Sequence, residues 1–468
     1  MVVTAAGCRG CLLPDRPVGT QDSVAGVLGN SFVVVAGNRG TVGTKSGAGQ
    51  GGMWNGGFSL AASNISRGWV RVPDVPATTH DSHSRLGFST GLAARVQLPF
   101  DWGESEALAW VGGFSHTNCS SEAFLMLPPS QNLSNYSYYR LPNFPYQIAQ
   151  ASVVASGTKL LVIGGSDCGL PPDTERFLTW TDRWGGQPGF GKHVFELDVS
   201  KCRRHGGGCE WVQLADFPGT PRARGTVATI NGSVYVLGGT TSSTTPGRKQ
   251  PNTSCTTIHV EGCQSNPLDN WQLELSTMKW TRLPNNPQVY SGNSAAVVVW
   301  QERYIITVGV DQRGRGLSFP GQKFSSLNAN DIPPWFGYPS GFQLNDSCSK
   351  PQPGWKTNGY PNRINVYDVV AQKFGTVSTS STEEPKLGPM AGCPAGLPLN
   401  CFSPQSAVIG NSLYVTGGEC DPHYVATDAP NGGMGHQTYW HYPRITLHGA
   451  LSSKPRGQTV AALGASHN

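Results

Sequence analysis

Short hydrophobic hairpins that end on a pair of glycines recur along this chain. The clearest copy is residues 225–239, GTVATINGSVYVLGG, in which two runs rich in β-branched residues flank Asn231-Gly232. Asn-Gly tolerates the positive φ angles of a two-residue hairpin turn. After an insertion, residues 271–275 and 279–283 supply two further alternating segments. The unit is therefore predicted to be a four-stranded antiparallel meander.

One such sheet cannot bury both of its faces, so several copies must pack on one another. Residues 151–165 and 405–419 repeat the pattern closely. Weaker copies end near Gly37, Gly113 and Gly309, which brings the number of copies to six. Because these copies are spread from residue 23 to residue 419, no repeat-free block is long enough for a separate core. We predict a single repeat domain.

A hairpin ending in Gly-Gly, a variable loop, and a Trp-containing outer strand followed by Leu and Pro together resemble the kelch repeat. Gly164-Gly165 with Trp211 and Gly238-Gly239 with Trp280 match best, whereas Ala36-Gly37 and Val308-Gly309 depart from the glycine pair. The resemblance covers roughly residues 23–450 and is to β-propellers of the galactose oxidase-like superfamily. It implies an all-β, six-bladed kelch-type β-propeller with long disulfide-stapled loops on one face.

The repeats also predict how the chain is divided. Residues 1–22 form an N-terminal arm and residues 451–468 a polar tail. After the last glycine pair only residues 444–447 read clearly as a strand, so a strand within the arm is expected to complete the last sheet and close the ring. The expected blades are residues 23–76, 91–145, 151–218, 225–284, 293–378 and 405–450.

Cysteines and glycosylation sequons favour the secretory pathway. The chain has 12 cysteines, several of them paired closely in sequence inside polar insertions, as loop-stapling disulfides often are. The disulfide candidates are Cys202 with Cys209, Cys255 with Cys263, and Cys393 with Cys401. The connectivity of Cys119, Cys168, Cys348 and Cys420 stays open. Asn-x-Ser/Thr sequons, the glycosylation candidates, begin at Asn64, Asn118, Asn132, Asn135, Asn231, Asn252 and Asn345.

An extracellular or lumenal location is therefore expected. Residues 1–20 lack the continuous apolar segment of a signal peptide, so either the start is incomplete or processed, or the compartment is wrong. No apolar run approaches the roughly 20 residues that cross a membrane. The net charge of +5 is spread thinly, without the basic runs of a nucleic-acid-binding protein. We expect a monomer that binds no nucleic acid and has no membrane span.

No metal or cofactor is expected. Only Cys8 and Cys11 have a C-x-x-C spacing, and no second such pair completes a zinc site. His436 and His441 with Tyr439 and Tyr442 are ligand types found in copper radical oxidases, but their spacing does not match.

The resemblance implies that loops after the glycine pairs and loops between blades open on one face. The residues expected there to bind ligand are Arg39, His116, Tyr146, Arg222, Arg224, Tyr290, Arg313 and Phe402. Asp167, Asp311 and Glu419 are candidate catalytic residues, because paired carboxylates and an arginine suit epimerisation of an acidic sugar. Some bacterial kelch propellers are sialic acid mutarotases. The alternative, which we favour, is that these carboxylates accept hydrogen bonds from backbone N–H groups in the turns and that the arginines tie neighbouring blades together.

Three functions remain in view. The first is a secreted or lumenal kelch protein that binds a protein or carbohydrate ligand on its loop-rich face. The second is a sialic-acid-type sugar mutarotase or epimerase, and the third is an intracellular adaptor, which predicts free thiols and no glycans. The propeller fold does not decide between them, because the same fold is found in binding modules and in enzymes. A binding role is favoured over catalysis.

Overall fold

The structure is a computed structural model that describes the strands of the repeats and many of the turns between them. The described residues are 11–14, 16–20, 22–37, 54–76, 93–99, 102–103, 105–113, 120–129, 135–167, 191–203, 207–223, 225–239, 241–242, 264–265, 269–285, 296–308, 364–376, 401–402, 404–410, 412–417, 419–420 and 446–450.

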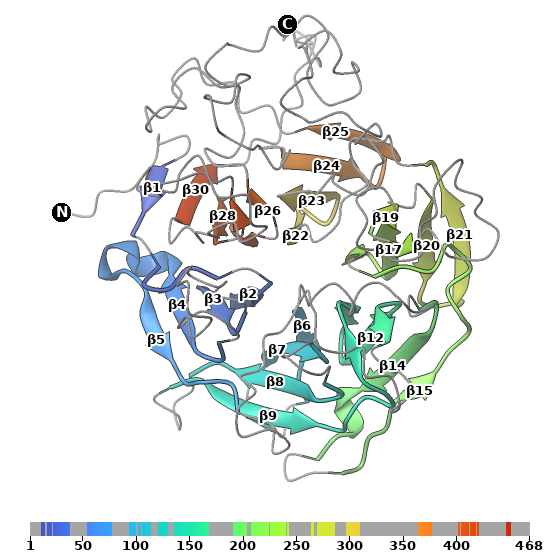
Figure 1. The fold of residues 1–468 in the computed structure, drawn as a ribbon, viewed down its shortest axis with the longest axis horizontal. Helices are drawn as coiled ribbons and strands as arrows, with labels where there is room; N and C mark the ends of the chain where they lie inside the picture. Colours follow the sequence, from blue (N-terminus) through green and yellow to red (C-terminus); the bar gives the residue numbers. More distant parts are fainter. Residues whose placement is uncertain are drawn as a thin grey trace, which may run out of the picture.

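Six four-stranded antiparallel sheets lie around a central axis (Figure 1). Five of them are meanders of strands that follow one another in the sequence. The first two comprise β2 (Val24–Leu28), β3 (Ser31–Val35), β4 (Gly57–Ala61) and β5 (Val70–Val72), then β6 (Ala94–Gln97), β7 (Glu106–Val111), β8 (Ala123–Leu127) and β9 (Ser137–Leu141). The third comprises β11 (Ser152–Ser156), β12 (Lys159–Ile163), β14 (Val194–Asp198) and β15 (Val212–Gln213). The fourth and fifth comprise β16 (Thr226–Ile230), β17 (Ser233–Leu237), β20 (Asn270–Glu274) and β21 (Lys279–Leu283), then β22 (Ala296–Trp300), β23 (Tyr304–Val308), β24 (Ile364–Asp368) and β25 (Lys373–Thr376).

The sixth sheet combines both ends of the chain. Its strands are ordered β27 (Gln405–Ile409), β28 (Ser412–Thr416), β30 (Thr446–Ala450) and β1 (Cys11–Leu13). β1 runs antiparallel to β30, with Cys11 opposite His448 and Leu13 opposite Thr446. The first strands of the six sheets contact one another in a closed circle, β2 to β6, β11, β16, β22, β27 and back to β2. The chain is therefore an all-β propeller, as the sequence predicts.

The hairpin of the fourth sheet has the predicted turn. Ile230 pairs with Ser233, and the two residues between them have positive φ angles, 49° at Asn231 and 73° at Gly232. This combination belongs to the turn whose twist matches that of the flanking strands. The hairpin prediction is confirmed.

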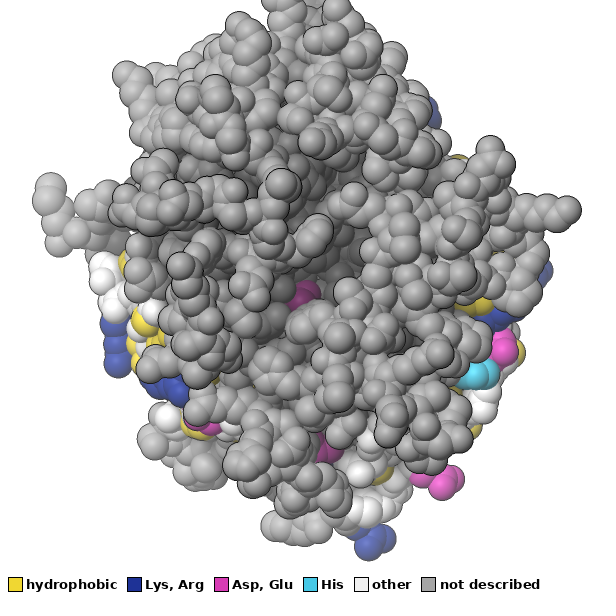
Figure 2. All heavy atoms as spheres, viewed as in Figure 1, with side chains coloured by type: hydrophobic (Ala, Val, Ile, Leu, Met, Phe, Trp, Pro, Cys, Tyr) yellow, Lys and Arg dark blue, Asp and Glu magenta, His cyan; other side chains and the backbone are white. Residues whose placement is uncertain are grey.

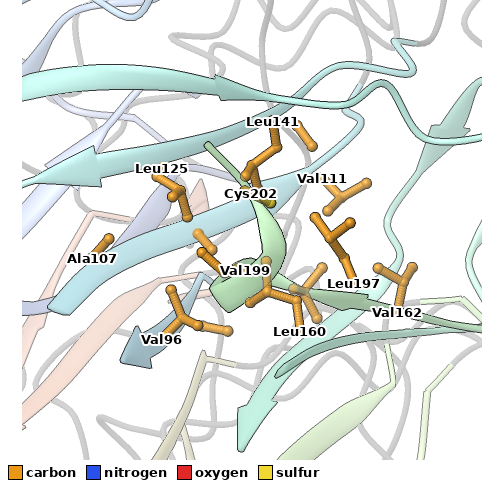
Figure 3. Packing of buried hydrophobic residues seen from close by; sticks show 14 of the residues in the cluster. Val96, Ala107, Val111, Leu125, Leu141, Leu160, Val162, Leu197, Val199 and Cys202 are labelled. Atoms are coloured by element: carbon orange, nitrogen blue, oxygen red, sulfur yellow. The ribbon is translucent and has the colours of Figure 1, made fainter. Parts of the chain in front are cut away.

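Hydrophobic side chains fill the space between neighbouring sheets. Figure 3 shows the cluster between the second and third sheets, where Val96 and Leu125 lie near Leu160 and Leu197. All four side chains are almost fully buried. Each such side chain contributes about 1.5–3 kcal/mol on burial, so the sheets hold together mainly through these contacts.

Aromatic pairs repeat at two successive sheet boundaries. Trp211 lies edge-on to Phe144, with ring centroids 5.2 Å apart, and Trp280 lies edge-on to Phe217 at 5.1 Å. Each tryptophan comes from the last segment of one sheet, and each phenylalanine follows the last strand of the sheet before it. The tryptophan of the repeat thus packs across the boundary, and edge-to-face pairs of this kind add about 0.5–1.5 kcal/mol each.

The described cysteines include one predicted disulfide. Cys202 and Cys209 are bonded, as predicted, in the connection between β14 and β15. Cys255, Cys263 and Cys393 lie outside the described residues.

Three of the predicted glycosylation residues can be placed. Asn64, Asn135 and Asn231 are exposed. The remaining sequons, which begin at Asn118, Asn132, Asn252 and Asn345, lie outside the described residues.

Across the part of the chain that the structure describes, no helix is long and apolar enough to span a membrane.

Candidate functional site

The glycine pairs mark the end of each sheet where segments from two neighbouring sheets meet. The Gly113 N–H donates to the Ile148 carbonyl at 2.8 Å, and the Gly165 N–H donates to the Arg222 carbonyl at 2.9 Å. A Cβ on Gly164 would lie only 2.4 Å from that same Arg222 oxygen. Only glycine permits this approach. We call this end of the propeller the glycine-pair face, after Gly112-Gly113, Gly164-Gly165, Gly238-Gly239 and Gly417.

Arg222 is buried at this face rather than presented to a ligand. Its side chain is 1% exposed, and Nη1 donates to the carbonyls of Gly238 at 2.8 Å and Asp269 at 3.0 Å. Its Nε donates to the Thr220 carbonyl at 2.9 Å, and the guanidinium lies 4.9 Å from the centre of the Phe217 ring. These contacts join the third sheet to the fourth, as expected for an arginine that ties neighbouring sheets.

Asp269 balances the charge of Arg222. Burial opposes ionisation of this carboxyl group, but the nearby Arg222 charge and hydrogen bonds from Thr220 and Trp271 outweigh burial and hold its pKa below the usual value. The carboxylate lies 2.7 Å from Arg222 Nη2. The pair is thus ionised at neutral pH and serves as a joint in the fold.

Tyr146 is the predicted ligand-binding residue that the structure places in an accessible cluster. Its half-buried ring lies edge-on to Phe144 at 4.9 Å and to Phe195 at 5.9 Å. On its other side the ring centroid is 6.4 Å from that of His193. Because the His193 carbonyl accepts a hydrogen bond from Gly164, the cluster lies at the glycine-pair face.

Two further polar side chains contact His193. His193 Nδ1 lies 3.0 Å from Asp216 Oδ1 and 3.3 Å from the Gln213 amide nitrogen. The side chains of His193 and Asp216 are 48% and 50% exposed. Figure 2 likewise shows a histidine side chain exposed beside an acidic one at the rim of the molecule. We call Tyr146, His193, Gln213 and Asp216 the Tyr146 surface.

The Tyr146 surface combines a held aromatic ring with exposed hydrogen-bonding groups. Phe144 and Phe195 restrict the ring, so little side-chain entropy is lost when a ligand packs against it. The carboxylate of Asp216 accepts hydrogen bonds, and the Gln213 amide both donates and accepts them. An apolar platform beside a few fixed polar groups is the usual composition of a small-molecule site. The surface is suited to a flat, hydroxyl-rich ligand.

Two short ladders place other predicted residues near the glycine pairs. Asp167 lies in β13 (Ser166–Asp167), opposite Ile148 in β10 (Ile148–Ala149). Glu419 lies in β29 (Glu419–Cys420), opposite Phe402 in β26 (Cys401–Phe402). Asp167 is the second residue after its glycine pair, whereas Glu419 is the first. The two candidate carboxylates therefore differ by one residue of register and do not occupy equivalent positions in their sheets.

The remaining candidates cannot be placed, and the sequence missed part of the Tyr146 surface. Six predicted residues lie outside the described residues, namely Arg39, His116, Arg224, Tyr290, Asp311 and Arg313. His193 directly precedes β14, and a histidine next to an apolar run that follows a glycine pair is the signal that could have found it. Gln213 and Asp216 gave none, since only pairing of β14 with β15 brings them to His193. Among the described side chains, no group of three or more potential metal ligands occurs.

Comparison with known proteins adds little to this geometry. No model of a known protein family matches the chain, and no curated protein matches it. Among solved structures, one titled "Structure of YjhT" is 13% identical, with a TM-score of 0.49, and the match covers 87% of this chain and 93% of that one. No functional residue is transferred from that structure.

Proposed function

We propose that this protein is a secreted or lumenal kelch-type glycoprotein that binds a carbohydrate, free or attached to a protein, on its glycine-pair face. The observation that carries this proposal is the Tyr146 surface, in which a held aromatic ring lies beside exposed carboxylate, imidazole and amide groups. Sugar rings offer an apolar C–H face to an aromatic ring and hydroxyl groups to the polar side chains around it.

Disulfide chemistry supports the proposed compartment. The Cys202–Cys209 bond closes the connection between two strands, and structural disulfides persist in oxidising compartments. The exposed sequons at Asn64, Asn135 and Asn231 are accessible to glycosylation there. The proposal extends the ligand surface to Phe402 and to the predicted residues Arg39, His116, Arg224, Tyr290 and Arg313.

Binding to the Tyr146 surface is tested with the Tyr146→Ala and Asp216→Asn variants on a glycan array, followed by calorimetry with the best ligand. Each variant is expected to lose about tenfold or more in affinity, because central aromatic and charged groups dominate binding energy. Tyr136→Ala is the matched control, since Tyr136 is a half-buried tyrosine that directly precedes β9 at the end opposite the glycine pair. Unchanged affinity in the two test variants would remove this surface from the site.

A sugar mutarotase or epimerase is the second candidate. It is favoured by the two short ladders, which put the backbones of Asp167 and Glu419 close to glycine pairs of the third and sixth sheets. Asp311 would complete the proposed set of carboxylates. An anomerisation assay by NMR on acidic sugars tests it, with Asp167→Asn and Glu419→Gln expected to abolish any activity. Turnover that survives both substitutions would exclude these catalytic roles.

A further inference from the structure

Cys401 and Cys420 are directly opposite each other in the ladder formed by β26 and β29. Residues opposite each other in an antiparallel pair have Cα atoms about 4.5–5.5 Å apart. A disulfide needs a Cα separation of about 4.4–6.8 Å. The backbone therefore already has the spacing of a disulfide-bonded pair.

The sequence alone pointed to a different partner. Cys401 was paired with Cys393 because the two are close in the chain, but proximity in sequence does not fix proximity in space. The ladder brings Cys401 to Cys420 instead, across the open end of the hairpin formed by β27 and β28. Each cysteine lies a few residues outside that hairpin, Cys401 before Gln405 and Cys420 after Thr416.

An equivalent ladder in the third sheet shows what the cysteines add. There β10 and β13 flank the hairpin of β11 and β12, with Ile148 opposite Asp167. β10 and β26 both begin four residues before the first strand of their sheet, so Cys401 and Cys420 occupy the register positions of Ile148 and Asp167. The third sheet has backbone pairing alone at this position. The cysteine pair occurs in the sheet that is assembled from both ends of the chain.

We propose that Cys401 and Cys420 form a disulfide that fixes the β26–β29 ladder at the glycine-pair face. The bond forms by thiol–disulfide exchange with a disulfide oxidant, either a small molecule or a protein. The two thiols lose two protons and two electrons, and the oxidant leaves as two thiols. The neighbouring register pair, Phe402 and Glu419, is thereby held in place. That consequence for ligand binding rests on the proposed function, whereas the disulfide itself does not.

Peptide mapping of the intact, oxidised protein tests the bond directly. The protein is alkylated while denatured and is then cleaved without reduction by trypsin and glutamyl endopeptidase. Cleavage after Lys386, Glu419 and Arg444 gives fragments 387–419 and 420–444. These fragments are expected to remain joined until reductant is added. Chymotryptic cleavage after Leu399 then separates Cys393 from Cys401 and identifies the bonded residue. A bond between Cys393 and Cys401, or an alkylated Cys420, would overturn the proposal.

Stability provides a second measurement. Cys401→Ser, Cys420→Ser and the double variant are each expected to lower Tm by roughly 5 °C, with no further loss in the double variant, because the three remove one bond. Cys393→Ser is the control and should leave fragments 387–419 and 420–444 joined. Losses that add up in the double variant would contradict a shared bond. If the serine variants do not fold, mapping of the unaltered protein still decides whether the disulfide is present.

A failure of glycan binding in a protein with the mapped disulfide would count against the proposed function alone.

Discussion

The carboxylate of Asp269 lies 2.7 Å from the guanidinium of Arg222, in a pair whose arginine is 1% exposed. Arg16 is equally buried, at 0% exposure, but it is held differently. Its Nη2 donates to the Thr20 carbonyl at 3.4 Å, and its Nε and Nη1 have no hydrogen-bond partner among the described residues. Burial lowers the pKa of Arg16 to about 9. Among the residues that the structure describes, a carboxylate therefore forms an ion pair with Arg222 but not with Arg16.

Substituting the two arginines by methionine should change stability by different amounts. Arg222→Met is expected to destabilise the protein by about 3–5 kcal/mol, because it leaves Asp269 charged and poorly solvated. Arg16→Met removes a buried charge without breaking an ion pair among the described residues, so it should change stability by about 1 kcal/mol or less, or stabilise. The free energy of unfolding in urea measures both. Similar losses in the two variants would show that Arg16 is also balanced by a negative group.

Acid should weaken the joint between Arg222 and Asp269. The folded-state pKa of Asp269 is below its unfolded value, so its contribution to stability is fully present above about pH 4 and is lost as the pH falls through the folded pKa. The Asp269→Asn variant cannot titrate there. We expect the stability difference between the unaltered protein and this variant to shrink between pH 6 and pH 3, measured by urea unfolding. A difference that stays constant with pH would contradict the linkage.

Alkali should act through Tyr367. Burial, together with Tyr235 and Asp368, raises the pKa of Tyr367 to about 12, against about 10 in the unfolded chain. The neutral phenol therefore stabilises the fold below pH 10, and this contribution is lost as the pH rises towards 12. Tyr367→Phe should be less sensitive to this range, measured by unfolding at pH 9 and pH 11. Equal sensitivity to pH in both proteins would show that folding does not raise the pKa of Tyr367.

Alanine substitutions at two glycines, one at each end of β12, distinguish the cost of backbone strain from the cost of a steric clash. Gly157 and Gly164 have φ angles of 58° and 62°, so alanine is strained at either position. A Cβ on Gly157 would meet only the Gln97 side chain at 3.8 Å, whereas a Cβ on Gly164 would lie 2.4 Å from a backbone oxygen. Gly157→Ala should cost about 1–2 kcal/mol and Gly164→Ala clearly more. Denaturant midpoints measure this, and equal losses would argue against close contact at the glycine pair.

The sequence predicted the parts of this fold that depend on neighbouring residues. Asn231-Gly232 determines its hairpin through its own backbone preferences, and Cys202 is near enough to Cys209 in the chain to be paired correctly. Contacts that depend on which strands pair cannot be predicted from residues that are adjacent in the sequence. Cys401 has Cys393 as its nearest cysteine in the sequence, and the hairpin pattern does not reveal the β26–β29 ladder that places Cys401 opposite Cys420.

Side-chain burial limited the prediction of the candidate site. Arg222 precedes a strand at the expected face, and its sequence context does not reveal that Asp269 will enclose it. Tyr146 occurs in a similar connecting segment, yet its ring stays accessible beside His193. The difference arises from Asp269, which precedes β20 more than 40 residues beyond Arg222, and no local pattern records a contact across that distance.

The pairing of β1 with β30 also sets the order in which the molecule can be completed. As the chain leaves the ribosome, each of the first five sheets has all of its strands once its own segment has emerged. The sixth must wait for residues 446–450, and β1 can pair only after these residues have emerged. Until then the sixth sheet has only β27 and β28, and β27 contacts both the first and the fifth sheet. The ring of sheets can therefore close through β27, and the sixth sheet is completed afterwards by β30 and β1.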